Sequence, residues 1–164
     1  MHARSKSKTF ETDHFDALST FVGISASSCF HKWPNRENRM GYNILLVDDS
    51  NVVKAVLMKI LAGSSLTINQ VFDAANGVEA LKTLNANEID LVITDINMPV
   101  MDGFELIERM HLDLMLKNIP VIVISTEGSL TRVSYLEEMG IRGYVRKPFV
   151  AGDILSVINE VLGG

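Results

Sequence analysis

Short runs of Val, Ile and Leu alternate with amphipathic stretches over residues 43–164, and this alternation constrains the fold more than any other feature of the chain. Several runs are apolar throughout, which is typical of strands covered on both faces. Strands that each lead into a helix predict a parallel sheet with right-handed crossovers. The five expected strands are Ile44–Val47, Val71–Ala74, Leu91–Thr94, Val121–Ser125 and Ile141–Val145.

Five helices are expected between and after these strands. In the first, apolar residues recur at intervals of three and four, as on one face of a helix. Two helices have an N-terminal capping signal followed three residues later by Glu, namely Asn76 with Glu79 and Asp102 with Glu105. The expected helices are Asn51–Ala62, Val78–Asn87, Phe104–Leu116, Leu130–Met139 and Ala151–Leu162. We therefore predict a doubly wound α/β fold.

Composition narrows the class of protein. The chain has 164 residues, 47% of them hydrophobic, and one cysteine, which excludes an internal disulfide framework and a cysteine zinc cluster. No apolar run approaches the ~18 residues of a membrane-spanning helix. Residues 43–164 carry a formal charge of −7 and residues 1–42 carry +2, which together give the net charge of −5. Because phosphate-backbone binding needs clustered basic residues, we expect a cytoplasmic protein that binds neither nucleic acid nor membrane.

The chain changes character near residue 42. Before it, Ser, Thr and His are frequent and apolar residues follow no sustained period. Acidic residues interrupt the basic start, and the stretch Leu18–Ser28 is too rich in Ser and Thr for a signal peptide. We interpret residues 1–42 as an extension, either disordered or an artefact of start-site choice, and residues 43–164 as the folded domain.

Charged residues stand within two positions of the ends of three expected strands. Asp48 and Asp49 follow the first strand, Asp95 the third and Lys147 the fifth. Ligand sites in open α/β sheets form at the carboxyl ends of the strands. Each Asp could instead cap a helix or end a strand, but three neighbouring carboxylates would repel one another unless a divalent cation were bound. Two carboxylates and a backbone carbonyl, that of Asn97, would suffice for Mg²⁺.

Two further strand ends contribute polar groups. A lone lysine is most often solvated, but Lys147 stands at a strand end before Pro148, where its ammonium could pair with Asp95 or with a phosphate on it. We expect Lys147 to contact the phosphate and not to hold the fold. Ser125, at the end of the fourth strand, offers a hydroxyl to a phosphate oxygen. The set suits Mg²⁺-assisted phosphoryl transfer onto a side chain.

Taken together, these strand ends resemble one family. Residues 43–164 are similar to a response-regulator receiver domain, with the motifs Met98-Pro99 and Asp102-Gly103 following the phosphoacceptor position. The resemblance implies a flavodoxin-like fold with strand order 2-1-3-4-5. It also implies the roles of the site residues. Asp48 and Asp49 are the acid pair and Asp95 is the phosphoacceptor. Ser125 is the hydroxyl switch residue, Tyr144 is the aromatic switch residue, and Lys147 is the lysine that pairs with the phosphoacceptor or its phosphate.

Within the family, the chain is most similar to stand-alone chemotaxis (CheY-like) receivers. Asn97 and Glu127 occupy the two positions that govern phosphate lifetime. Two departures stand out: Ser125 replaces the commoner Thr, and Thr126 stands where Ala or Gly is usual, so its bulk restricts access to the phosphoacceptor.

The resemblance implies a monomeric phosphoacceptor switch that catalyses only its own phosphorylation and dephosphorylation. A histidine kinase would phosphorylate Asp95, and with no effector domain after Gly164 the output would be protein binding. The expected output surface comprises the fourth helix, the fifth strand and the fifth helix. The partner would be a flagellar-motor switch component, or a phosphotransfer protein if the chain is an intermediate of a relay.

Two other readings compete. A phosphatase of the haloacid-dehalogenase type also uses an aspartyl nucleophile, Mg²⁺ and Lys, but places the nucleophile on its first strand. Here the order is inverted, and Asn97 stands where a second acid would protonate the leaving group. A pseudo-receiver that only binds partners would normally lack an acid or the lysine, whereas every position is filled here.

Overall fold

The computed structural model of the chain describes residues 39–126 and 129–163. The predicted extension therefore lies outside the described residues up to position 38, as does Glu127. Among the described residues, every helix is too short or too polar to cross a lipid bilayer.

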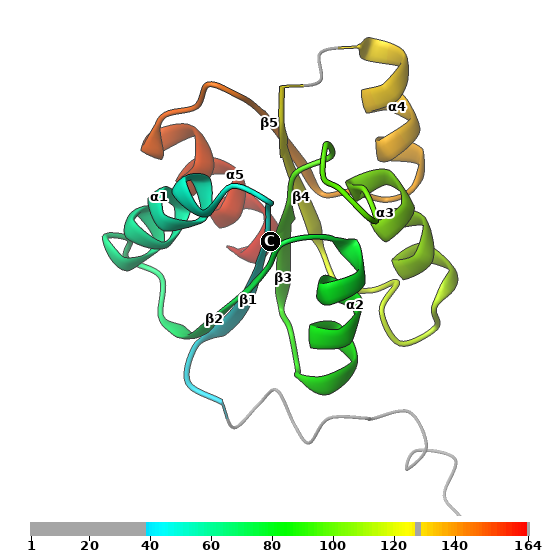
Figure 1. Cartoon of the computed structure of the whole chain (residues 1–164). Helices are drawn as coiled ribbons and strands as arrows, with labels where there is room; N and C mark the ends of the chain where they lie inside the picture. Colours follow the sequence, from blue (N-terminus) through cyan, green and yellow to red (C-terminus); the bar gives the residue numbers. More distant parts are fainter. Residues whose placement is uncertain (1–38, 127–128, 164) are drawn as a thin grey trace, which may run out of the picture. The chain divides into compact units, whose positions relative to one another are not determined.

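A single parallel sheet organises the described residues (Figure 1). Its strand order is β2-β1-β3-β4-β5, and all four strand pairs are parallel. This order confirms the predicted doubly wound, flavodoxin-like α/β fold. The strands are β1 (Tyr42–Val47), β2 (Ile68–Ala74), β3 (Leu91–Thr94), β4 (Val121–Ser125) and β5 (Gly143–Arg146).

The helices cover both faces of the sheet (Figure 1). α1 (Asn51–Ala62) and α5 (Ala151–Gly163) pack on one face. α2 (Gly77–Ala86), α3 (Gly103–Leu112) and α4 (Leu130–Glu138) pack on the other.

The side chains of β1 feed two separate cores because successive residues of a strand point to opposite faces. Ile44 and Leu46 join the core beneath α1 and α5, while Leu45 and Val47 join the core beneath α2, α3 and α4. Since both faces are covered, β1 is apolar along most of its length, as the continuous pattern predicted.

Capping predictions are confirmed at two helix starts. The Asn76 side chain accepts a hydrogen bond from the Glu79 N–H at 3.1 Å, and the Asp102 side chain accepts one from the Glu105 N–H at 2.9 Å. Satisfying these otherwise unpaired N–H groups fixes where α2 and α3 begin.

The predicted end of α3 at Leu116 is wrong, since the helix stops at Leu112. Asp113 ends it: its carboxylate accepts hydrogen bonds from the N–H groups of Met115 and Leu116, an arrangement that competes with helix. β5 begins at Gly143, two residues later than predicted, and the N–H of the preceding residue, Arg142, donates to the carbonyl of Val121 in β4.

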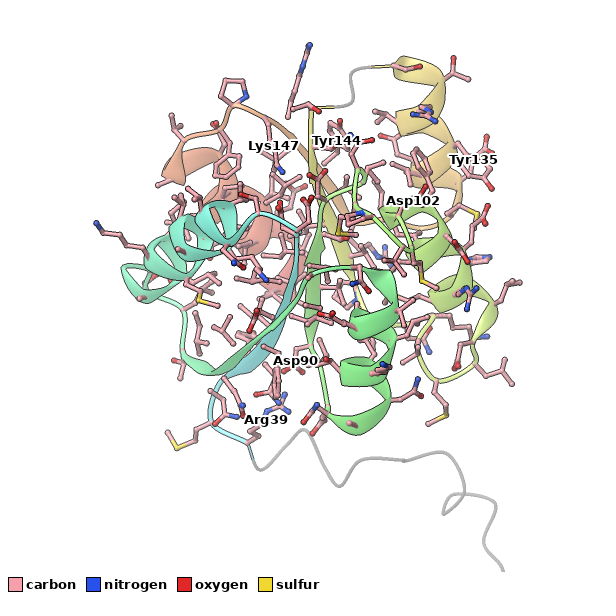
Figure 2. All side chains as sticks on the ribbon, in the orientation of Figure 1. Arg39, Asp90, Asp102, Tyr135, Tyr144 and Lys147 are labelled. Carbon is pink, nitrogen blue, oxygen red and sulfur yellow. The ribbon has the colours of Figure 1, made fainter. Side chains whose placement is uncertain are left out.

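The chain enters the domain at the end of the sheet opposite the strands' carboxyl ends. Arg39 forms ion pairs with Glu88, at 3.0 Å, and with Asp90, whose side chain is almost fully buried. Tyr42 is already part of β1. Figure 2 shows Arg39 and Asp90 together at this end, away from Lys147. The domain boundary between residues 42 and 43 stays a prediction. Arg39, which forms these ion pairs, lies on the N-terminal side of that boundary.

Candidate functional site

Three carboxylates meet at the carboxyl edge of the sheet. Asp48 and Asp49 follow β1, and Asp95 follows β3, the neighbouring strand. One oxygen from each lies within 4.8 Å of the others. Asp48 and Asp95 are only 3% and 9% exposed, whereas Asp49 faces solvent. The acidic cluster therefore has a buried base and an open mouth.

Lys147 reaches this cluster from the end of β5. Its ammonium nitrogen lies 2.9 Å from Asp48 Oδ2 and 2.7 Å from Asp95 Oδ2. Burial lowers the pKa of Lys147, but its hydrogen bonds to Asp95 and Asp48 and the negative charges of these two acids together outweigh this effect, so the pKa stands above its usual value. The lysine is therefore a fixed cation between the two buried acids.

The backbone holds Lys147 in place. Its N–H donates to the Ser125 carbonyl at 2.9 Å, which ties the residue to the end of β4, and the Lys147–Pro148 peptide bond is cis.

Each buried carboxylate divides its two oxygens between backbone and lysine. Asp48 Oδ1 accepts the N–H of Ser50 at 2.7 Å. Asp95 Oδ1 accepts the N–H of Ile96 at 2.6 Å and that of Asn97 at 3.3 Å. In both residues Oδ2 is left for Lys147, so the Oδ2 atoms are the ones turned toward the pocket.

The predicted hydroxyl and amide also lie at this edge. Ser125 is fully buried, and the Asn97 side-chain amide lies 3.5 Å from its Oγ. Tyr144 on β5 is half-buried and packs against the core beneath α2, α3 and α4. Figure 2 shows Tyr144 near Lys147, at the same end of the domain. The roles assigned to these residues stay predictions.

Gly103 is a supporting residue whose role the sequence reasoning missed. Its N–H donates to the Ile96 carbonyl at 2.9 Å, and a Cβ on it would lie 2.2 Å from the Asp95 carbonyl oxygen. Only glycine allows α3 to begin so close to the loop that carries Asp95. The Asp102-Gly103 pair was the available signal, but the contact with Asp95 follows only from the fold.

The donor set suits a hard divalent cation. Carboxylate oxygens are ordinary Mg²⁺ ligands, and Mg²⁺ keeps several waters, so an open site with few protein ligands is appropriate. Asp48, Asp49 and Asp95 provide such oxygens, with one from each lying within 4.8 Å of the others.

A doubly wound parallel sheet with an acid pair, an isolated aspartate and a lysine at its carboxyl edge is the arrangement of the CheY-like receiver class. The family model of the response regulator receiver domain matches residues 44–159, and the chain belongs to this family.

Individual relatives support the same family. The chain is 36% identical over 121 residues to the chemotaxis protein CheY1 of Helicobacter pylori, covering 73% of this chain and 96% of that protein. The structure of the chemotaxis response regulator CheY4 of Vibrio cholerae matches with a TM-score of 0.67 and 30% identity, covering 74% of this chain and 98% of that one. The phosphorylated cyanobacterial phytochrome response regulator RcpA matches with a TM-score of 0.63 and 25% identity, covering 74% and 91%.

This family membership places the chain in two-component signalling. Receiver domains of this type are phosphoacceptor switch proteins that typically bind Mg²⁺ at an acidic pocket, and here the acidic pocket is present.

Proposed function

We propose that this protein is a response regulator in which Asp95 accepts a phosphoryl group from a histidine kinase, with Mg²⁺ held by Asp48, Asp49, Asp95 and the Asn97 carbonyl. The observation that carries the proposal is the bridging position of Lys147, 2.7 Å from Asp95 and 2.9 Å from Asp48. An ammonium held in this position can stabilise the negative charge of a phosphoryl group transferred to Asp95.

The geometry supports a direct transfer. Asp95 Oδ2 attacks the phosphorus of a phosphohistidine; the new oxygen–phosphorus bond forms while the phosphorus–nitrogen bond breaks, and the imidazole leaves. Bound Mg²⁺ would neutralise charge on the phosphoryl oxygens. Asp95 Oδ1 stays bound to the backbone N–H groups, which keeps the nucleophilic oxygen aimed outward. Lys147 then pairs with a phosphoryl oxygen.

Exposed apolar residues near the site support docking of a protein donor. Val52 lies three residues beyond Asp49, Val100 five beyond Asp95 and Val150 three beyond Lys147, and all three are at least 66% exposed. Solvent-exposed valines around a charged pocket suit a partner that presents a histidine on an apolar surface.

For the output, we propose the surface formed by α4, β5 and α5. Movement of the Ser125 hydroxyl toward the phosphoryl group would vacate space for Tyr144, which is half-buried here. Asn97 and Glu127 would set the lifetime of the phosphate. The chemotaxis relatives favour a flagellar-motor switch component as the partner; a phosphotransfer protein of a relay is the alternative.

The test uses a small phosphodonor with Mg²⁺. Wild-type protein should gain one acid-stable, base-labile phosphate, and Asp95→Asn should gain none. Asp102→Asn is the matched control, because Asn caps α3 as well as Asp does and the residue lies on the same loop. Full incorporation in Asp95→Asn, or in excess chelator, would contradict the proposal. Sustained hydrolysis of added phosphate esters would favour the phosphatase.

A further inference from the structure

α4 is held to the domain by little apolar contact. Among its described side chains, only Leu136 is buried, whereas α3 buries Leu106, Ile107 and Met110. Because apolar burial is the main force that fixes a surface helix, other contacts must contribute to the position of α4.

Those contacts are made with α3. The Tyr135 hydroxyl donates a 2.5 Å hydrogen bond to Glu108 Oε1, and the Tyr135 ring lies 6.4 Å from that of Phe104. The Arg132 guanidinium lies 5.0 Å from the centre of the Phe104 ring, within cation–π range. We call these four residues, two on each helix, the α3–α4 latch.

The hydrogen bond also affects the tyrosine itself. The bond to Glu108 is the main cause that raises the pKa of Tyr135 above 10.0, with burial and the charges of Glu108 and Glu138 adding to it. The hydroxyl is therefore protonated, and able to donate, throughout the physiological pH range.

The latch joins the two chain segments that lead away from the candidate site. α3 begins at Gly103, whose N–H is bound to Ile96, next to Asp95. α4 follows the end of β4, where Ser125 is buried. Figure 2 shows Tyr135 on α4, with Asp102 at the start of α3. A displacement of Ser125 toward a phosphoryl group would therefore pull on one side of the latch while α3 stays anchored.

We propose that Tyr135 is a positioning residue whose contacts hold α4 in the unphosphorylated arrangement and so oppose the switch. This inference rests on the proposed function, because it assumes that phosphorylation moves α4. A contact present in only one of two states biases the equilibrium toward that state. Loosening the latch should therefore make the phosphorylated arrangement easier to reach.

The experiment titrates the protein with beryllofluoride, which mimics the phosphoryl group, in the presence of Mg²⁺. It measures the beryllofluoride concentration that gives half of the maximal conformational response. Tyr135→Phe removes the hydroxyl and keeps the ring, so folding should be preserved. It should lower the beryllofluoride concentration for half-maximal response about threefold, as expected for loss of one exposed hydrogen bond that only the resting state makes. Glu108→Ala should give a similar shift, and the double variant no more than either alone.

Glu105→Ala is the matched control. Glu105 lies on α3 and pairs with Arg109, outside the latch, so its loss should leave the half-maximal concentration unchanged. Amide hydrogen exchange supplies a second readout: without beryllofluoride, α4 should exchange faster in Tyr135→Phe than in wild type.

Two results would overturn the inference: an unchanged or higher half-maximal concentration in Tyr135→Phe, or unchanged exchange in α4. A lower melting temperature with no shift in activation would mean that Tyr135 is only structural. If wild-type protein itself failed to respond to beryllofluoride, the proposed function would fail, and the exchange measurement would still decide whether the latch holds α4.

Discussion

The ammonium nitrogen of Lys147 lies 2.7 Å from Oδ2 of Asp95, although the two residues are 52 positions apart in the chain. The same nitrogen contacts Asp48, and both acids are buried. One lysine therefore pairs with two carboxylates at the base of the pocket and offsets one of their two negative charges. This arrangement changes our expectation that Lys147 would not contribute to the fold.

Replacement of Lys147 by Ala should lower the free energy of unfolding in Mg²⁺-free buffer. Removing one partner of a buried pair leaves charge uncompensated, and we expect a loss of about 1–3 kcal/mol, discounted because the pocket opens to solvent. Mg²⁺ should restore part of this loss, since it binds the same carboxylates. Urea unfolding with and without Mg²⁺ measures both effects.

Lys54→Ala is the control for that prediction. Lys54 is a buried lysine, paired with Asp73 at 3.0 Å. Asp73 belongs to β2 and is not part of the acidic cluster. The stability loss of Lys54→Ala should be the same with and without Mg²⁺. A loss in Lys147→Ala that Mg²⁺ does not reduce would show that the lysine supports the fold independently of the pocket's charge.

Val100 should be replaceable with a gain in stability. It adopts φ of 71° in the loop after Asp95, a conformation that is unfavourable for a β-branched residue, and it is 83% exposed. Val100→Asn or Val100→Gly should raise the free energy of unfolding by about 1 kcal/mol. Val100→Ala keeps the Cβ and should gain less. Equal or lower stability in the Asn and Gly variants would contradict the prediction.

Gly103 and Gly152 should respond in opposite ways to the same substitution. A Cβ at Gly103 would meet the Asp95 carbonyl at 2.2 Å, whereas one at Gly152, in α5, would meet nothing within 4 Å. Gly103→Ala should cost about 2 kcal/mol or more and reduce phosphate incorporation, because the Asp95 loop must move. Gly152→Ala should stabilise by about 0.5–1 kcal/mol. Thermal unfolding distinguishes them, and similar melting temperatures would refute the contrast.

The start of the domain can be located by truncation. A chain beginning at Met40 should still fold and accept phosphate, but it lacks the ion pairs from Arg39 to Glu88 and Asp90. A chain beginning at Asn38 retains them and should be about 1–2 kcal/mol more stable, because the Asp90 side chain is almost fully buried. Equal stability of the two chains would show that Arg39 is not part of the folding unit.

The strands and the gathering of acids could be predicted because both depend on local pattern, whereas the strand order followed from the resemblance to receiver domains. Apolar runs mark strands, parallel strands share one carboxyl edge, and a charge placed after each run must lie there. The position of Lys147 between two particular oxygens was beyond this reasoning, since it depends on which oxygen each backbone N–H already occupies.

Features that depend on how helices meet were not predictable. Tyr135 and Glu108 are 27 positions apart, and their contact requires the relative placement of α3 and α4. The end of α3 was missed because Leu114, Met115 and Leu116 continue the apolar pattern, yet only Leu116 is buried. The positive φ of Val100 has no sequence signal, since valine is a residue that rarely adopts it.

The alternation of β1 side chains between two cores has an evolutionary consequence. α3 and α4, which carry the latch, share one core, and α1 and α5 share the other. Substitutions in separate cores act nearly independently, since their side chains do not touch. A lineage adapting to a hotter habitat could repack the layer beneath α1 and α5 and leave the contacts between α3 and α4 unaltered.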